Sequence, residues 1–133
     1  MQKIEIVVRN CVLLQLLALL LLTTTAQAEG VRARYLENSG KTSVLEIIIE
    51  DPAPSSVIVK QYLPAGKSVE STLPAYTKYS AKKKMLTWLF KRPVSGVKQI
   101  VTHYTSPLAG EGASAVIRCK NPRDGTLMTI NVQ

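Results

Sequence analysis

Short segments of alternating apolar and polar residues, separated by breaks that contain Pro or Gly, are the feature that most restricts the fold of this chain. In the segment 44–50, Leu45, Ile47 and Ile49 share one face of a strand, whereas Glu46 and Glu50 point to the other face. Comparable strands are predicted at 31–36, 44–50, 56–63, 68–73, 85–90, 97–105, 113–119 and 126–132. We therefore predict an all-β protein of seven to eight antiparallel strands.

The breaks between these segments carry residues that end strands or make turns. The stretch 51–56, Asp-Pro-Ala-Pro-Ser-Ser, cannot continue a strand because Pro lacks the backbone donor that a ladder needs. In the stretch 121–125, Asn-Pro-Arg-Asp-Gly, the Asp-Gly pair is a hairpin signal. Regularly spaced short strands with such turns are typical of an immunoglobulin-like β-sandwich.

The first 28 residues have the three parts of a secretory signal peptide. Lys3 and Arg9 give a basic start, the run 11–22 is apolar, and Ala26-Gln-Ala28 places small residues where a signal peptidase cleaves. The apolar run is shorter than the roughly 20 residues of a membrane-spanning helix. We expect residues 1–28 to be removed and residues 29–133 to form a single domain, exported to the periplasm, the cell surface or the medium.

Removal of the leader leaves a basic chain with one cysteine. The whole chain has 17 Lys and Arg, 9 Asp and Glu, and a net charge of +8. Without Lys3, Arg9 and Glu5 the net charge is +7, and Cys119 is the only thiol, so no internal disulfide can form. Such a cysteine is buried and inert, pairs with another chain, or is a free reactive thiol. Its place in an alternating segment favours burial.

Few residues of this chain could perform chemistry. The single histidine, His103, has no acidic or thiol partner within four residues, and the chain has no nucleophile-elbow motif. Metal binding would need the fold to bring further donors to this histidine. We expect no catalytic site, no metal site and no cofactor. An enzyme would require a pocket that gathers His103, Cys119 and a carboxylate.

Six cations are the candidate ligand-binding residues: Lys78, Lys82, Lys83, Lys84, Lys91 and Arg92. If 82–84 form a turn and 91–92 end the following strand, about 20 Å of strand separates two basic patches. One interpretation is binding to an anionic polymer of the cell envelope, such as an acidic polysaccharide. The other is a solvated turn whose lysines discourage aggregation. Nucleic acid is disfavoured, because the chain lacks known readout motifs and is expected to be exported.

Three residues are predicted to lie in the core: Trp88, Tyr104 and Cys119. Trp88 stands between Leu86 and Phe90 in an alternating strand, a pattern typical of a sandwich core rather than a sugar-stacking platform.

Several segments resemble the conserved-repeat immunoglobulin-like domains of bacterial and archaeal secreted and surface proteins. The stretch 56–69, Ser-Val-Ile-Val-Lys-Gln-Tyr-Leu-Pro-Ala-Gly-Lys-Ser-Val, is similar to the "strand, Leu-Pro-x-Gly, strand" signature of that family. The segments 85–90 and 100–107 resemble its Trp and Tyr strands. The resemblance covers roughly residues 48–132 and implies a fold without catalytic residues. This chain differs in having one copy and in carrying Lys82-Lys-Lys84 in place of a polar or glycine-containing turn.

Two functions follow as expectations. The first is a non-catalytic structural or interaction module that binds an envelope or surface protein, or another cell-surface component, through strand edges or loops. The alternative is an electrostatic binder of anionic envelope polymers through the 82–84 turn. Neither function requires a membrane span after the leader is removed.

Overall fold

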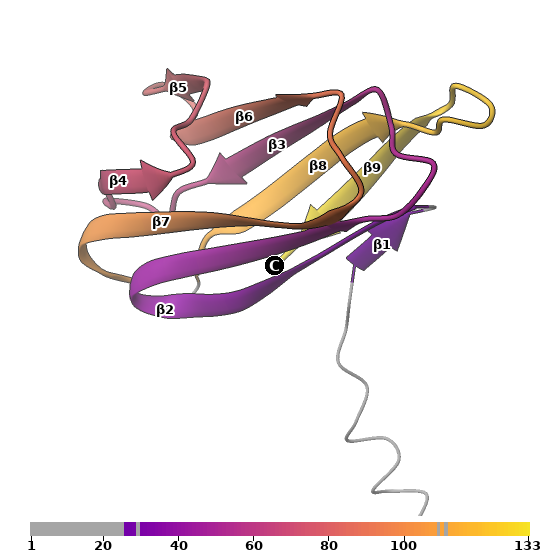
Figure 1. Cartoon of the computed structure of the whole chain (residues 1–133). Coiled ribbons are helices and arrows are strands. Elements are labelled where there is room, and N and C mark those ends of the chain that lie inside the picture. Colours follow the sequence, from indigo (N-terminus) through magenta and orange to yellow (C-terminus); the bar gives the residue numbers. More distant parts are fainter. Residues whose placement is uncertain (1–25, 29, 109, 111) are drawn as a thin grey trace, which may run out of the picture.

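The fold was analysed in a computed structural model that describes residues 26–28, 30–108, 110 and 112–133. The described residues form two antiparallel sheets that pack face to face (Figure 1). Sheet A has the order β1-β2-β7-β4, and sheet B has the order β5-β6-β3-β8-β9. The strands are β1 (Ala26–Ala28), β2 (Val31–Ile49), β3 (Ser56–Tyr62), β4 (Val69–Leu73), β5 (Lys78–Ser80), β6 (Met85–Lys91), β7 (Gly96–Leu108), β8 (Ser114–Lys120) and β9 (Leu127–Val132). The prediction of an all-β, antiparallel fold is therefore confirmed.

The number of strands differs from the seven to eight that the alternation predicts. The described residues form nine strands, and the two extra ones, β1 and β5, have three residues each. A segment of three residues is too short to show a period of two, so alternation could not reveal either strand. Of the predicted signal peptide, only Ala26–Ala28 lies within the described residues; these residues form β1, so the predicted cleavage would remove this strand from sheet A.

The long strand β2 joins two of the predicted segments and reverses its direction between them (Figure 1). The backbone nitrogen of Glu50 donates to the carbonyl oxygen of Gly30 (2.8 Å), so the two ends of this ribbon lie side by side. Gly40, which lies between the two arms of β2, adopts a positive φ of 59°. A glycine adopts this left-handed conformation without the steric cost that a side chain brings.

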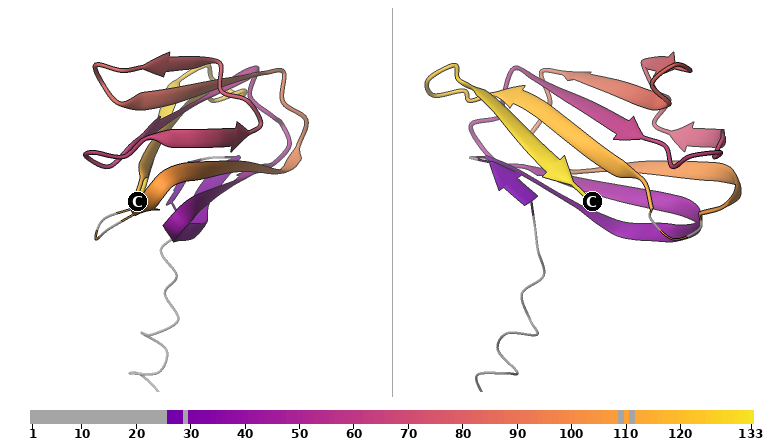
Figure 2. Two further views of the ribbon diagram at one scale, coloured as in Figure 1. Left: turned by 90° about the vertical axis from the view of Figure 1, so that its left-hand side faces the viewer. Right: turned by 180° about the vertical axis from the view of Figure 1, so that it is seen from behind.

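The core lies between the two layers (Figure 2). Each long strand alternates buried and more exposed positions, and β3 does so strictly from Ser56 to Tyr62. The largest fully buried side chains are Trp88, Tyr104, Leu45, Ile47, Ile49, Leu86, Ile100, Ile117, Gln61, Val31, Val57 and Val59. Both sheets contribute to this set, so burial of these apolar groups holds the layers together.

Trp88 connects β6 to the opposite side of the sandwich. Its side chain is 1% exposed, and its indole nitrogen donates to the carbonyl oxygen of Pro74 (3.0 Å), just after β4. A buried indole usually needs such a partner, because its N–H is costly to bury alone. This bond ties sheet B to the end of an edge strand of sheet A.

A buried cluster of polar side chains also joins the two sheets. The amide nitrogen of Gln61, on β3 of sheet B, donates to the hydroxyl oxygens of Thr102 (3.0 Å) and Tyr104 (3.2 Å), on β7 of sheet A. The hydroxyls of Tyr104 and Ser43 share a further bond of 2.9 Å, and the hydroxyl of Tyr35 donates to the amide oxygen of Gln61 (3.3 Å). Burial raises the pKa of both tyrosines, so the cluster stays uncharged.

Asn38 fastens the β2 turn to the connection between β7 and β8. Its side-chain nitrogen donates to the carbonyl oxygen of Ala113 (2.8 Å), and its side-chain oxygen accepts from the nitrogen of the same residue (2.9 Å). A Cβ added to Gly112 would collide with the Asn38 amide group. The close approach of this amide therefore requires glycine at position 112.

We expect Tyr104→Phe to lower the free energy of unfolding by about 1–3 kcal/mol, because Gln61 and Ser43 lose a partner inside the core. Urea unfolding followed by tryptophan fluorescence measures this change. Tyr79→Phe is the matched control, because Tyr79 is exposed, and should leave the midpoint unchanged. Equal stability of the two variants would show that the buried cluster contributes little.

We expect Gly112→Ala to destabilise the protein by about 1–3 kcal/mol, because the new Cβ displaces the amide that bonds Ala113. Asn38→Ala should cost a similar amount through loss of the same bonds. A double-mutant cycle measured by urea unfolding tests this origin. The cost of Gly112→Ala should largely vanish in the Asn38→Ala background, and a full additional cost there would contradict the explanation.

Candidate binding surface

The six predicted cations lie at two ends of one hairpin. Lys82, Lys83 and Lys84 form the exposed turn between β5 and β6, and Lys78 lies on β5 beside that turn. Lys91 ends β6, and Arg92 follows it. Lys78 therefore lies near the turn, whereas Lys91 and Arg92 lie at the opposite end of the seven-residue strand β6.

Basic residues with an unusual backbone conformation flank both ends of β6. Lys84 and Arg92 have positive φ values of 49° and 48°. The left-handed conformation costs a residue with a side chain roughly 1–2 kcal/mol. Each position is fixed by the ends of β3, because Leu63 donates its backbone N–H to Lys84 (2.9 Å) and Arg92 donates to Ser55 (2.8 Å).

The outer face of sheet B carries three further cations that the sequence analysis did not single out: Lys60, Arg118 and Lys120. Lys60 points outward because its neighbours Val59 and Gln61 are both fully buried. Arg118 and Lys120 likewise alternate with buried Ile117 and Cys119. Lys78 pairs with Thr87, which pairs with Lys60, so these three residues also share this face.

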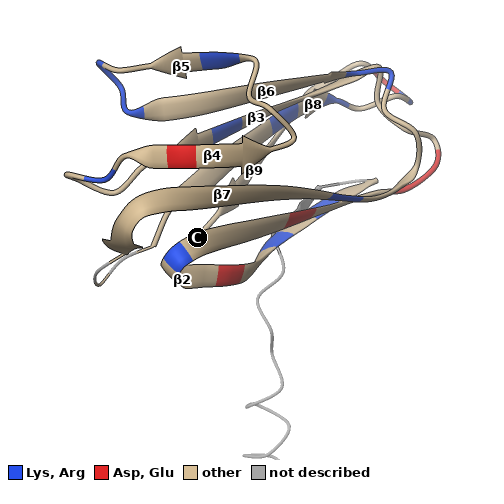
Figure 3. Cartoon of the chain, turned by 60° about the vertical axis from the view of Figure 1, so that its left-hand side comes forward, with Lys and Arg blue, Asp and Glu red and all other residues tan. Residues whose placement is uncertain are grey.

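No acidic residue occurs in β3, β5, β6, β8 or β9. The described acidic residues lie on sheet A or in connections: Glu37, Glu46, Glu50, Asp51, Glu70 and Asp124. In Figure 3 the acidic residues lie on β2, β4 and the loops, whereas basic residues lie on the strands of both sheets. Sheet B therefore presents a face with charges of one sign.

Two acidic residues on or next to β2 are already paired with arginines of the same strand. Arg32 bonds Glu50 (2.8 Å), and Arg34 bonds Glu46 (3.0 Å). These are the ion pairs between residues that the structure describes, and neither reaches sheet B. The positive charges of the sheet B strands thus have no ion-pair partner among the described residues, and their field extends into solvent.

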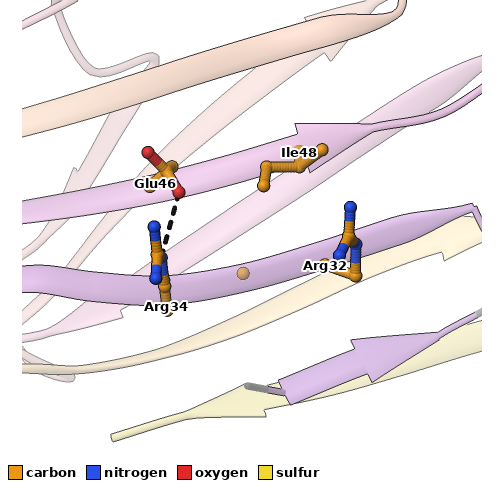
Figure 4. Close-up of a pocket in the computed structure, with 5 residues that line it drawn as sticks. Arg32, Arg34, Glu46 and Ile48 are labelled. Carbon is orange, nitrogen blue, oxygen red and sulfur yellow. Dashed lines mark hydrogen bonds and ion pairs between the residues drawn. The ribbon is translucent and has the colours of Figure 1, made fainter. Parts of the chain in front are cut away.

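A shallow pocket of about 160 Å³ lies at these ion pairs (Figure 4). It is lined by Arg32, Ala33, Arg34, Glu46 and Ile48. A ligand carboxylate or phosphate entering it would have to compete with Glu46 for Arg34 and with Glu50 for Arg32. This pocket is therefore a weaker anion site than the uncompensated face of sheet B.

The structure separates the residues that an enzyme would need together. His103 is exposed on the outer face of sheet A, where its Nδ1 lies 3.3 Å from the hydroxyl of Thr42. Cys119, on β8, faces the core, and its side chain is 3% exposed. Burial raises the pKa of its thiol. The described residues contain no group of three or more His, Cys, Asp or Glu that could hold a metal ion.

All three residues that were assigned to the core are buried. Trp88 and Tyr104 are at most 1% exposed, and Cys119 pairs on its two sides with Val57 and Met128. These side chains build the interior and do not face the basic surface. The candidate surface thus consists of outward-facing cations carried by strands whose alternate residues form the core.

The free edges of the sheets differ in how they are protected against pairing with another strand. The edge strands β1 and β5 are short, β4 carries Glu70, and β5 carries Lys78. Short length and charge are common protections of edge strands. The edge strand β9 has six residues and no charged one, and β1 and β2 lie close to it.

Among the residues that the structure describes, no helix has the length and apolar character needed to cross a membrane. Comparison of the chain with protein-family models, curated proteins and solved structures gave no match. The proposals that follow therefore rest on the fold and its surfaces alone.

We expect Cys119 to resist a thiol reagent in the native protein, because the thiol is buried and its raised pKa disfavours the reactive thiolate. In a Cys11→Ser background, labelling with a maleimide should become fast only in denaturant. A Ser39→Cys variant supplies an exposed control thiol that should label at once. Fast labelling of native Cys119 would contradict its burial.

Cys119→Ser should cost about 1–3 kcal/mol of unfolding free energy.

Proposed function

We propose that this chain is an exported, non-catalytic interaction module that binds an acidic component of the cell surface through the outer face of sheet B. The single observation that carries the proposal is the one-sided charge of that face. Five cations lie in its strands (Lys60, Lys78, Lys91, Arg118 and Lys120) without an acidic residue among them. The lysine turn 82–84 extends this charge beyond the edge of the sheet.

We also propose that the sandwich is immunoglobulin-like, and the strand order supports this. The second arm of β2, then β7 and β4, are neighbours in sheet A, and β3, β8 and β9 are neighbours in sheet B. In chain order these strands correspond to B-E-D and C-F-G of an immunoglobulin-like sandwich. The hairpin β5–β6 extends the second sheet next to β3. Domains of this kind serve commonly as binding modules.

The spread of charge over the face favours binding along the sheet over binding at the 82–84 turn alone. A turn with three lysines offers a point of attachment, whereas the sheet continues the positive field across four strands, β5, β6, β3 and β8. Clusters of uncompensated charge raise the local concentration of oppositely charged ligands and speed association. We therefore place the 82–84 turn at the rim of the binding surface.

A second candidate function is binding of a protein strand at the edge of β9. The observation that favours it is the uncharged, six-residue edge of this strand. An extended segment of a partner could add to such an edge through backbone hydrogen bonds. This mode depends little on salt, because the backbone bonds carry no net charge, so it can be distinguished from the electrostatic mode.

Capture from an envelope extract at two salt concentrations tests these functions. The protein, expressed from its full gene and purified, is immobilised and exposed to extract at about 0.05 M and 0.5 M salt, where the range of electrostatic attraction differs several-fold. We expect an acidic component to bind at low salt and to be lost at high salt. The double variant Lys60→Gln/Arg118→Gln should capture much less of it.

A matched control removes the same charge elsewhere. Lys41→Gln/Lys67→Gln changes two cations outside the strands of sheet B and should leave capture nearly unchanged. An equal loss in both double variants would indicate an effect of net charge and would overturn the assignment to this face. A defined protein that survives high salt and is indifferent to both variants would support the β9 edge instead.

A further inference from the structure

We infer that the outer face of sheet B recognises a linear acidic polysaccharide in which charged and neutral sugars alternate, lying across the strands. This inference rests on the proposed function and assigns a ligand class to the same surface. It depends on how cations and hydroxyl groups follow one another from strand to strand, which is fixed by the register of the sheet.

Over β5, β6 and β3 the central row of the face reads cation, hydroxyl, cation, and beyond Lys60 it continues with Val116 and Asn131. Lys78 on β5 pairs with Thr87 on β6, and Thr87 pairs with Lys60 on β3. Neighbouring strands lie about 4.8 Å apart, so the two lysines are separated by roughly 10 Å with a hydroxyl halfway between them. A polymer that crosses β5, β6 and β3 along this row meets a charge at the first and third of these strands. If every unit of a polymer were charged, the charge on the unit between the two lysines would lie against Thr87.

The positive track continues diagonally beyond Lys60. Lys60 pairs with Val116, and Arg118 lies two residues further along β8, which places it about 8 Å from Lys60. Lys120 follows about 7 Å beyond Arg118 on the same face. The track from Lys78 to Lys120 is therefore about 25 Å long. It suits an extended ligand better than a single anion, because no described pocket gathers these cations.

Polar and apolar side chains beside the track match a sugar chain more closely than a phosphate polymer. Asn131 closes the central row, and Thr129 pairs with Arg118 in the next row. Leu89, 38% exposed, pairs with Ile58 between Lys60 and Lys91. Sugars present both hydroxyl groups and apolar ring faces, so they can use all of these contacts, whereas a phosphate polymer has no apolar face to place against Leu89.

Calorimetric titration with three anionic oligomers tests the inference. The probes are a hyaluronan decasaccharide, in which a uronic acid alternates with a neutral amino sugar, a polygalacturonate decasaccharide, in which every sugar is charged, and inorganic polyphosphate of similar length. Each is titrated into the full protein at about 0.15 M salt, the physiological ionic strength. We expect the alternating decasaccharide to bind more tightly than the fully charged one, in spite of its lower charge.

Three substitutions separate charge from hydroxyl recognition. Lys60→Gln should weaken binding of every probe that the protein binds. Thr87→Val keeps the β-branched shape but loses one hydrogen bond, so it should weaken the alternating decasaccharide about 3- to 10-fold. The same change should weaken polyphosphate less, because its binding depends mainly on the cations. Lys41→Gln, on β2 of sheet A, is the charge-matched control and should change none of the affinities.

Each other outcome overturns a distinct statement. Tighter binding of polygalacturonate, or indifference of the alternating decasaccharide to Thr87→Val, overturns the inferred ligand pattern and leaves the proposed function intact. If only polyphosphate binds, the face recognises charge and not sugars. The inferred ligand pattern is then wrong, and the proposed function stands. If no probe binds and capture of an acidic component also fails, the proposed function itself is wrong.

Discussion

The hydrogen bonds of Gln61 fix the register of β3, and the basic face depends on that register. Gln61 reaches across the sandwich to Thr102 and Tyr104, so β3 can hold only one alignment without leaving buried polar groups unpaired. A slip of one residue would turn every side chain of β3 to the opposite face. Lys60 would then point into the core. The buried amide thus determines where the central cation of the outer face lies.

The alternation of apolar residues predicted most strands and the three core residues, because a period of two is a local property of the chain. It could not predict which strands become neighbours. Lys60 and Lys78 are 18 positions apart and share a row only because β6 lies between β3 and β5. The sequence shows Arg118 as an isolated charge in an apolar strand, and only the pairing of β8 with β3 brings it to the same face.

The folded chain separates its charges in a way that net charge does not reveal. Arginines of β2 pair with Glu46 and Glu50, whereas the cations of the sheet B strands have no ion-pair partner among the described residues. Exposed ion pairs contribute little to stability. Their larger effect here is that two acidic groups are held on sheet A, away from the basic face.

A flat face suits a ligand that is long rather than bulky. Such a surface cannot enclose a small molecule and remove it from water, so the contacts that it offers are individually weak. Affinity must then come from several contacts made along one chain, each of which raises the effective concentration of the next. The left-handed conformations of Lys84 and Arg92 fit this view, because glycine would be less strained at both positions but would remove a cation from each end of β6. Both positions thus carry a cation although their backbone conformation favours glycine.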